Sequence, residues 1–149
     1  MADETRKGTG GYFVEPQATI EAGEFKPEFV NVADVPLFNV VEGLGLKPVF
    51  GEKILLSFVY MEPNSVAPVH SHPEEQMGTM IEGEYEFELN GVKRLMRPGD
   101  VYIVPPNVPH GARTFDKPCL ALDIFSPPRS GYREMMDEAL GQQAKEKSE

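Results

Sequence analysis

Three histidines are the side chains of this sequence best suited to chemistry. His70 and His72 are separated by one residue, and His110 follows the proline-rich loop PPNVP in a second segment. The chain has 3 histidines in 149 residues, so all of them fall in these two segments. Residues i and i+2 of a strand project from one face, and imidazole nitrogens bind divalent transition metals. We therefore predict that His70, His72 and His110 converge on one metal ion.

An oxygen ligand is expected beside the three imidazoles. Gln76 follows His72 after a bend, and its amide is neutral, as imidazole is. An ion held by these four groups would keep its full formal charge of +2 and attract a carboxylate or an enolate. Glu75 is the alternative ligand, but it lies one residue out of register. We predict one divalent ion per chain, with Zn, Ni, Fe and Mn as the candidate metals.

The segment CLALDIF contains a second group of candidate residues. Asp123 and Phe125 alternate along an expected strand and share one face, and Arg129 follows in the next turn. An acidic residue on an apolar face is costly unless that face borders a wet cavity. We predict Asp123 as a general acid–base and Arg129 as a clamp for a carboxylate. The structural alternatives are an Asp that caps the following turn and a solvated Arg.

Strand patterns dominate the chain that positions these residues. Short apolar runs alternate with Pro, Gly and Asn, which is typical of a β-sandwich or barrel. The segment 84–96 predicts a hairpin in which Asn90 and Gly91 form a type I′ turn. Residues 97–100 predict another tight turn, and 101–105 and 119–125 predict strands. Met77, Met80 and Met96 are expected inside the barrel, and Arg113 is a candidate for substrate contact.

We expect three regions along one domain. Residues 1–28 form a flexible arm, residues 29–127 form the barrel, and residues 128–149 contain a short helix and a tail. The helix formers of GYREMMDEAL predict a helix that stops at Gly141.

Composition narrows the functional classes. Fourteen basic and 24 acidic residues give a net charge of −10, which disfavours nucleic acid and anionic membranes as partners. The beginning of the sequence lacks the apolar stretch of a signal peptide, and no apolar run is long enough for a membrane span. Cys119 is the single cysteine, so a disulfide framework is not expected. These features predict a cytoplasmic protein.

The two histidine segments resemble the two cupin motifs. The first has His70, His72, Gln76 and Gly83 in place, with Gln76 where Glu is usual. The second segment has its matches at Gly99, Pro105 and His110, with Thr114 in place of a final Asn. Asparagine replaces the usual glycine at positions 64 and 107, where it can still adopt a left-handed backbone. The resemblance implies an all-β cupin jelly roll with a short C-terminal helix.

A narrower resemblance covers residues 29–132. The segments HSHPEEQ, PPNVPHG and LDIFSPPRSGYR resemble the small cupins of pectin degradation, the KdgF family. This resemblance implies opening of the ring of 4,5-unsaturated galacturonate to its linear keto form. The matching metal ligands are His70, His72, Gln76 and His110. Asp123, Phe125 and Arg129 match the active-site motif, with Phe125 packing against the sugar.

Two other classes of function remain open. Three histidines with open coordination positions also suit an Fe(II)-dependent dioxygenase, for which oxygen uptake would be diagnostic. A cupin that binds a small molecule without converting it is the second alternative. Open sheet edges and the apolar segment 35–41 also predict a homodimer, because that segment could pack against the sheet of a partner.

Overall fold

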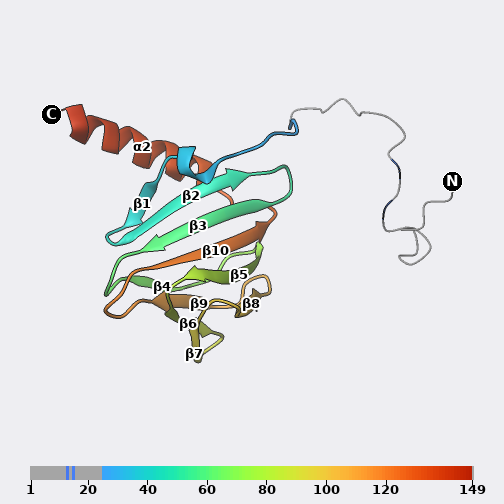
Figure 1. The fold of residues 1–149 in the computed structure, drawn as a ribbon, viewed down its shortest axis with the longest axis vertical. Helices are drawn as coiled ribbons and strands as arrows, with labels where there is room; N and C mark the ends of the chain where they lie inside the picture. The colour runs from blue at the N-terminus through green and yellow to red at the C-terminus, as the bar shows by residue number, and fades with distance from the viewer. Residues whose placement is uncertain (1–12, 14, 16–24, 149) are drawn as a thin grey trace.

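Among the residues that the computed structural model describes, ten strands and a C-terminal helix make up the fold (Figure 1). The structure describes residues 13, 15 and 25–148. The predicted arm, residues 1–28, therefore lies mostly outside the described residues. A short 3-10 helix, η1 (Val32–Asp34), precedes the strands. Within the described part of the chain, no helix is long and apolar enough to cross a membrane.

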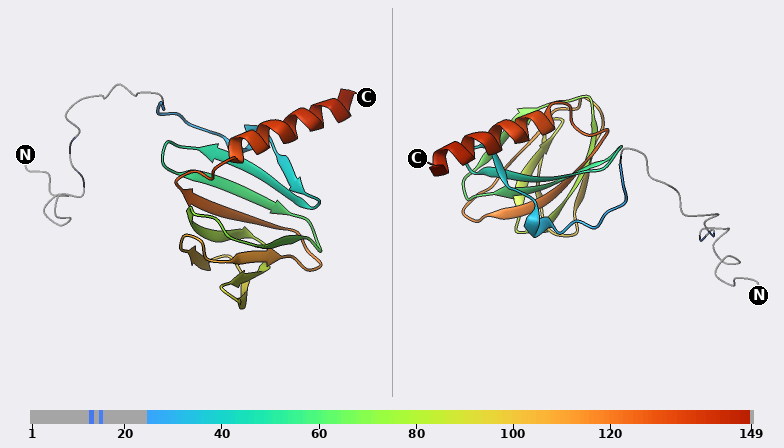
Figure 2. Two further views of the ribbon diagram at one scale, coloured as in Figure 1. Left: turned by 180° about the vertical axis from the view of Figure 1, so that it is seen from behind. Right: turned by 90° about the horizontal axis from the view of Figure 1, so that it is seen from above.

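The strands form two antiparallel sheets that face each other (Figure 2). The larger sheet has the order β1-β2-β3-β10-β5-β8 and the smaller one has the order β4-β9-β6-β7. The bounds are β1 Phe38–Val41, β2 Leu44–Phe50, β3 Leu55–Met61, β4 Val66–His70, β5 Glu75–Glu82, β6 Tyr85–Leu89, β7 Val92–Met96, β8 Val101–Val104, β9 His110–Arg113 and β10 Cys119–Ser126. This arrangement confirms the predicted all-β jelly roll.

The predicted turns form where the sequence places them. Asn90 and Gly91 both have positive φ, and they connect the paired strands β6 and β7. Gly99 also has a positive φ in the turn closed by the hydrogen bond from Asp100 N to Arg97 O. Asn64 and Asn107 adopt the left-handed backbone expected of them, with φ of 56° and 66°. These turns fix the strand register, and the register determines which side chains face the interior.

Two local predictions are wrong. Met77 is 40% exposed, because strict alternation along β5 turns Gln76, Gly78 and Met80 inward and Met77 outward. The C-terminal helix, α2 (Tyr132–Ser148), continues through Gly141. A glycine inside a helix costs only about 1 kcal/mol relative to alanine, and helix formers flank this one on both sides. In Figure 1, α2 lies beside β1 and β2 at one end of the barrel.

An apolar patch covers the outer face of the larger sheet at the β5–β8 edge. Met77 and Ile81 on β5 are each 40% exposed, and Val101 and Ile103 on β8 are 60% and 56% exposed. Met77 pairs with Ile103 across the two strands, so the patch is continuous. In segment 35–41, β1 pairs with β2 of its own chain and buries Phe38 completely. The segment also exposes Leu37, Val40 and Val41, but at 39–45% they are less exposed than Val101 and Ile103. We therefore expect a homodimer to form through the β5–β8 patch.

Replacing Ile103 by glutamate should convert this dimer to a monomer, because two carboxylates would be buried in the apolar contact. Light scattering at micromolar concentration measures the mass. The control is Val92→Glu, since Val92 is 67% exposed on β7 of the other sheet. A dimer is expected for the control, and a monomeric wild-type protein would contradict the prediction.

Candidate metal centre and active site

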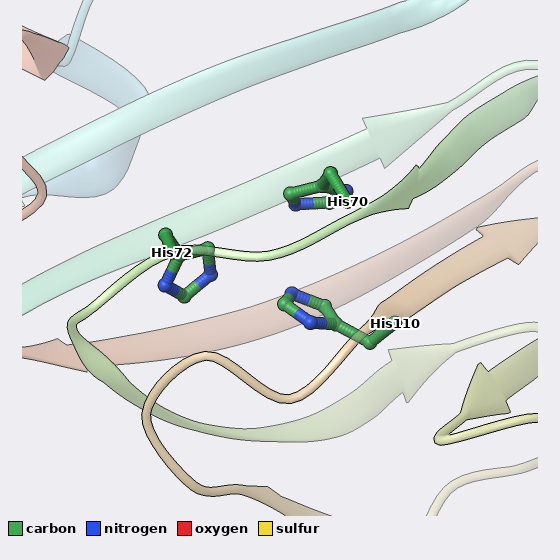
Figure 3. Close-up of side chains that lie close together, drawn as sticks. All are labelled: His70, His72 and His110. Atoms are coloured by element: carbon green, nitrogen blue, oxygen red, sulfur yellow. The ribbon is translucent and has the colours of Figure 1, made fainter.

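The three histidines converge at one end of the barrel (Figure 3). His70 ends β4, His110 begins β9, and the two residues are paired across these strands. His72 lies in the loop that leads into β5. One ring nitrogen of each histidine lies within 4.8 Å of the others. This triad could hold a metal ion, as predicted from the sequence.

Each imidazole is held by a backbone carbonyl of its own segment. The Nδ1 atoms of His70, His72 and His110 lie 2.7, 3.0 and 2.9 Å from the carbonyl oxygens of Pro68, Glu74 and Val108. A carbonyl oxygen can only accept, so each Nδ1 carries the proton and each Nε2 has a free lone pair. Fixing the tautomer through the second ring nitrogen is the usual way in which proteins prepare a histidine for a metal.

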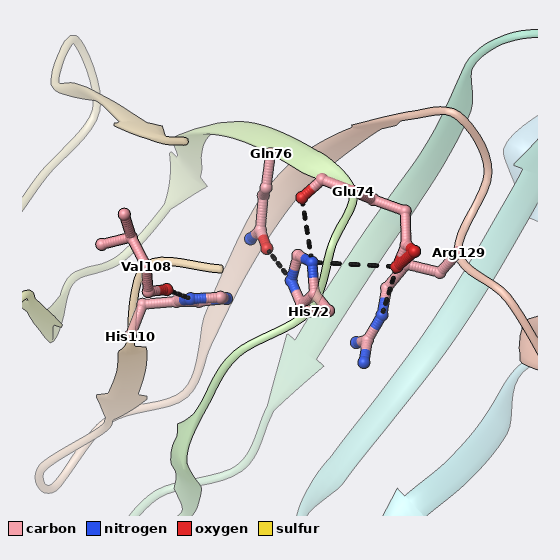
Figure 4. Close-up of polar contacts among 6 residues, drawn as sticks. All are labelled: His72, Glu74, Gln76, Val108, His110 and Arg129. Carbon is pink, nitrogen blue, oxygen red and sulfur yellow. Dashed lines mark hydrogen bonds and ion pairs between the residues drawn. The ribbon is translucent and has the colours of Figure 1, made fainter. Parts of the chain in front are cut away.

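The donor atoms around His72 fit a cation. Its Nε2 atom lies 3.0 Å from Oε1 of Gln76 (Figure 4). The amide nitrogen of Gln76 is engaged elsewhere, because it hydrogen-bonds to Asp123 and thereby lowers the pKa of that carboxyl. A lone pair of His72 therefore faces a lone pair of Gln76. Two acceptors at this separation favour a positive ion beside them.

His110 supports the same interpretation. Its Nε2 atom is, among the buried side-chain nitrogens and oxygens of the described residues, the one without a hydrogen-bond partner. Burial, with smaller contributions from the neighbouring histidines and Arg129, lowers the pKa of His110 to about 4. Burial and then the charge of Arg129 also lower the pKa of His72. Both rings are therefore neutral at pH 7, which is the form that binds a metal.

Asp123 lies in a row of residues that crosses the larger sheet. It pairs with Ser57 on β3 and with Gly78 on β5, and Gly78 pairs in turn with Tyr102 on β8. Burial raises the pKa of Asp123 to about 6, while hydrogen bonds from Tyr102 and Gln76 and the charge of Arg129 act in the opposite direction. A carboxyl group with a pKa near neutrality is suited to moving a proton.

Two tyrosines that were not predicted from the sequence support Asp123. Tyr102 donates its hydroxyl proton to Oδ1 of Asp123. The hydroxyl groups of Tyr85 and Tyr102 are 2.7 Å apart, so Tyr85 must donate to Tyr102. Burial raises the pKa of both tyrosines well above the usual value, which keeps them protonated. In the sequence, both tyrosines occupy ordinary apolar strand positions, and nothing there distinguishes them from core residues.

Gly78 makes room for the Tyr102 ring. A Cβ atom at Gly78 would lie 2.2 Å from ring atoms of Tyr102, which is far inside van der Waals contact. We therefore expect Gly78→Ala to lower the free energy of unfolding by about 1–3 kcal/mol. Urea unfolding measures the change. Gly141→Ala is the control, because a Cβ there meets nothing within 4 Å and should instead stabilise α2 by up to about 1 kcal/mol. An unchanged Gly78→Ala protein would contradict this expectation.

Arg129 is already paired within the protein. Its Nε atom lies 4.0 Å from Oε1 of Glu74, and the same carboxylate oxygen lies 3.8 Å from Nδ1 of His72 (Figure 4). Glu74 is only 5% exposed and was not predicted as a site residue. The neighbouring Glu75 is exposed, whereas Gln76 is only 4% exposed and faces the histidines. The positive charge of Arg129 is therefore partly balanced by the carboxylate of Glu74.

Phe125 lies at the site, whereas Arg113 does not. The Phe125 ring lies 5.5 Å from the His72 ring, and the Arg129 guanidinium lies 5.7 Å from the centre of the Phe125 ring. Arg113, predicted as a substrate contact, points away from the site. It hydrogen-bonds to Glu86 at 3.0 Å and packs over Phe115 on the outside of the smaller sheet. The prediction for Arg113 is therefore wrong.

A pocket of about 400 Å³ connects these groups. This volume is in the range of small-molecule sites. Its polar wall contains His70, Gln76, His110, Asp123 and Arg129. A histidine triad that could hold a metal ion, in a two-sheet jelly roll and beside such a pocket, is the arrangement expected of a cupin.

The comparison with protein families agrees with the fold. Residues 57–125 match the family model described as "Cupin domain". The chain therefore contains a cupin domain over these residues. This confirms the resemblance inferred from the two histidine segments.

Known relatives carry several functional names. The chain is 23% identical over 101 residues to "Pectin degradation protein KdgF" of Dickeya dadantii, which covers 66% of this chain and 92% of the relative. The solved structure of KdgF from Halomonas sp. has a TM-score of 0.67 and 28% identity, and covers 70% of this chain and 97% of that one. The chain is also 36% identical over 79 residues to "Dimethylsulfoniopropionate lyase DddQ" of Ruegeria pomeroyi, over 52% of this chain. The matched region spans 39% of the length of DddQ.

Proposed function

We propose that this cupin is a metal-dependent enzyme that opens the ring of 4,5-unsaturated galacturonate to the linear keto form. The observation that carries the proposal is the position of Asp123. Its carboxyl group is hydrogen-bonded to Gln76, whose amide oxygen faces the His72 lone pair. Asp123 thus lines one pocket together with His70, Gln76 and His110, three of the four proposed metal ligands. The likeness to KdgF proteins over most of the chain supports the choice of substrate.

His70, His72, Gln76 and His110 would hold the ion. A divalent ion supplies positive charge that binds the substrate carboxylate and stabilises negative charge on a neighbouring oxygen. None of the four ligands carries a charge of its own, so this positive charge is not reduced. The fixed Nδ1 protons keep the rings aimed at the site through the reaction.

Asp123 carries the proton in the proposed reaction. It accepts the proton of the C1 hydroxyl, and the C1–O5 bond breaks as the C1 carbonyl forms. O5 then becomes the keto oxygen on C5 as the C4–C5 double bond is lost, and Asp123 returns the proton to C4. The result is an isomerisation, because no atom or electron is gained or lost. The hydrogen bond from Tyr102 to Oδ1 of Asp123 fixes the orientation of the carboxyl group toward the pocket. Arg129 holds negative charge, and the Phe125 ring packs against the sugar.

Loss of ultraviolet absorbance from the conjugated double bond tests the proposal. We expect metal-loaded wild-type protein to accelerate the decay of 4,5-unsaturated galacturonate, and protein treated with a chelator to leave it at the spontaneous rate. If the loaded protein also leaves the spontaneous rate unchanged, the uronate assignment is wrong. Oxygen consumption with ferrous ion would then favour the dioxygenase.

A further inference from the structure

The pocket continues beyond the polar wall into a second, apolar half. Along β3 the side chains of Ser57, Val59 and Met61 face inward. On the neighbouring strand β10, Asp123 pairs with Ser57, and the apolar Ala121 pairs with Val59. Alternate residues of a strand lie about 7 Å apart, so Met61 lies about 13 Å along the strand from Ser57. The character of the wall therefore changes from polar to apolar along the strands.

Both sheets contribute to this apolar half. The larger sheet provides Leu44 and Leu46, which pair with Met61 and Val59 and line the same pocket. The smaller sheet provides Ala67 and Ala112, which pair with each other across β4 and β9. Ala112 lies two residues beyond His110. The small alanine side chains leave room in front of the branched residues on the opposite wall.

We propose that the pocket binds a small carboxylic acid that carries an apolar group on the side away from its carboxylate. The carboxylate lies at the histidine triad, and the apolar group extends along the strands between Ala112 and Val59. This inference rests on carboxylate binding at the proposed metal site. It goes beyond the uronate reaction, because hydroxyl groups that reached Leu46, Val59 and Met61 would lose their hydrogen bonds to water without replacement.

The length of the apolar group sets the expected affinity. Burying one methylene strengthens binding roughly fourfold. For wild-type protein loaded with zinc, calorimetry with acetate, butyrate, hexanoate and octanoate should show this increase until the chain fills the pocket. Galacturonate should bind more weakly than hexanoate. Equal affinity across the series would overturn the proposal, and so would binding of hexanoate that survives removal of the zinc.

Two variants locate the apolar group. Ala112→Leu should fill the space between the sheets. It should lower the affinity for octanoate at least tenfold and leave the affinity for acetate unchanged. Ala67→Leu narrows the pocket from the neighbouring strand and serves if the first variant does not fold. Zinc content and thermal unfolding confirm that each protein is intact. Equal losses for acetate and octanoate in an intact variant would contradict the placement.

The outcome also separates the two proposals. A chain-length series without uronate conversion would remove the ring-opening reaction and retain the apolar half. Uronate conversion without a chain-length dependence would retain the ring-opening reaction and remove the apolar half. Absence of any metal-dependent carboxylate binding would remove both.

Discussion

His110→Ala is expected to lose nearly all of its bound metal. The variant removes the one buried side-chain atom of the described residues that has a lone pair and no hydrogen-bond partner. It also leaves His70 and His72 with a ring-sized gap at their side, where the His110 ring centroid is 4.5 and 4.9 Å away. Changing a residue that merely orients a ligand costs about 10–100-fold in metal affinity, so loss of a ligand should cost at least 100-fold.

Elemental analysis of the purified protein and competition with a chelator measure this loss. Wild-type protein should carry close to one divalent ion per chain. The matched control is Glu75→Gln, which changes the rival oxygen ligand. Because Glu75 is exposed on the opposite face of β5 from Gln76, its substitution should leave the metal content unchanged. A His110→Ala protein with full metal content would contradict the assignment of His110 as a metal ligand.

Asp123→Asn should bind metal normally and convert 4,5-unsaturated galacturonate about 10²–10⁴-fold more slowly than wild type. Asparagine can still accept a hydrogen bond from Tyr102, but it cannot take up a proton. The absorbance assay measures the rate, and elemental analysis verifies the metal. Tyr85→Phe is a useful comparison, because it removes the outer hydroxyl of the hydrogen-bonded chain and leaves the carboxyl group in place. An active Asp123→Asn protein would exclude Asp123 as the proton carrier.

The same substitution should stabilise the metal-free protein. The pKa of Asp123 rises on folding from 3.8 to about 6, so the folded state binds more protons than the unfolded state between these values. The contribution of Asp123 to stability therefore falls as the pH rises through this range. At pH 8 the variant should gain up to about 3 kcal/mol, and less to the extent that water in the pocket solvates the carboxylate. Urea unfolding at pH 8 and pH 4 tests this, since the gain should vanish at the lower pH.

Local sequence signals were sufficient to predict the strands and turns. The asparagines at 64, 90 and 107 were placed correctly because a left-handed residue is required at a tight turn whatever packs around it. The spacing of the histidines predicted that they converge, but the strand alternation assumed for the first pair holds only up to His70, because His72 lies in the loop after β4. The same alternation turns Met77 outward, because Met77 is adjacent to the inward-facing Gln76, and its apolar character does not change this.

The supporting residues of the site depend on contacts between distant strands. Tyr102 reaches Asp123 only because β8 pairs with β5 and β5 pairs with β10, with Gly78 between the two side chains. Glu74 meets Arg129 only because the segment before α2 brings Arg129 back to it. The local sequence does not indicate either contact. Tyr102 therefore looks like an ordinary core residue there, and Glu74 looks like an ordinary solvated one.

The carbonyl oxygens that hold the three imidazole rings have a consequence for how this protein can change over time. Every amino acid supplies a peptide carbonyl, so substitutions at Pro68, Glu74 or Val108 leave the acceptors in place while the backbone keeps its path. Side chains of the pocket wall other than the proposed metal ligands could therefore vary while these acceptors stay in place. A chain built in this way can acquire a new substrate by mutation of the wall and keep the same ion.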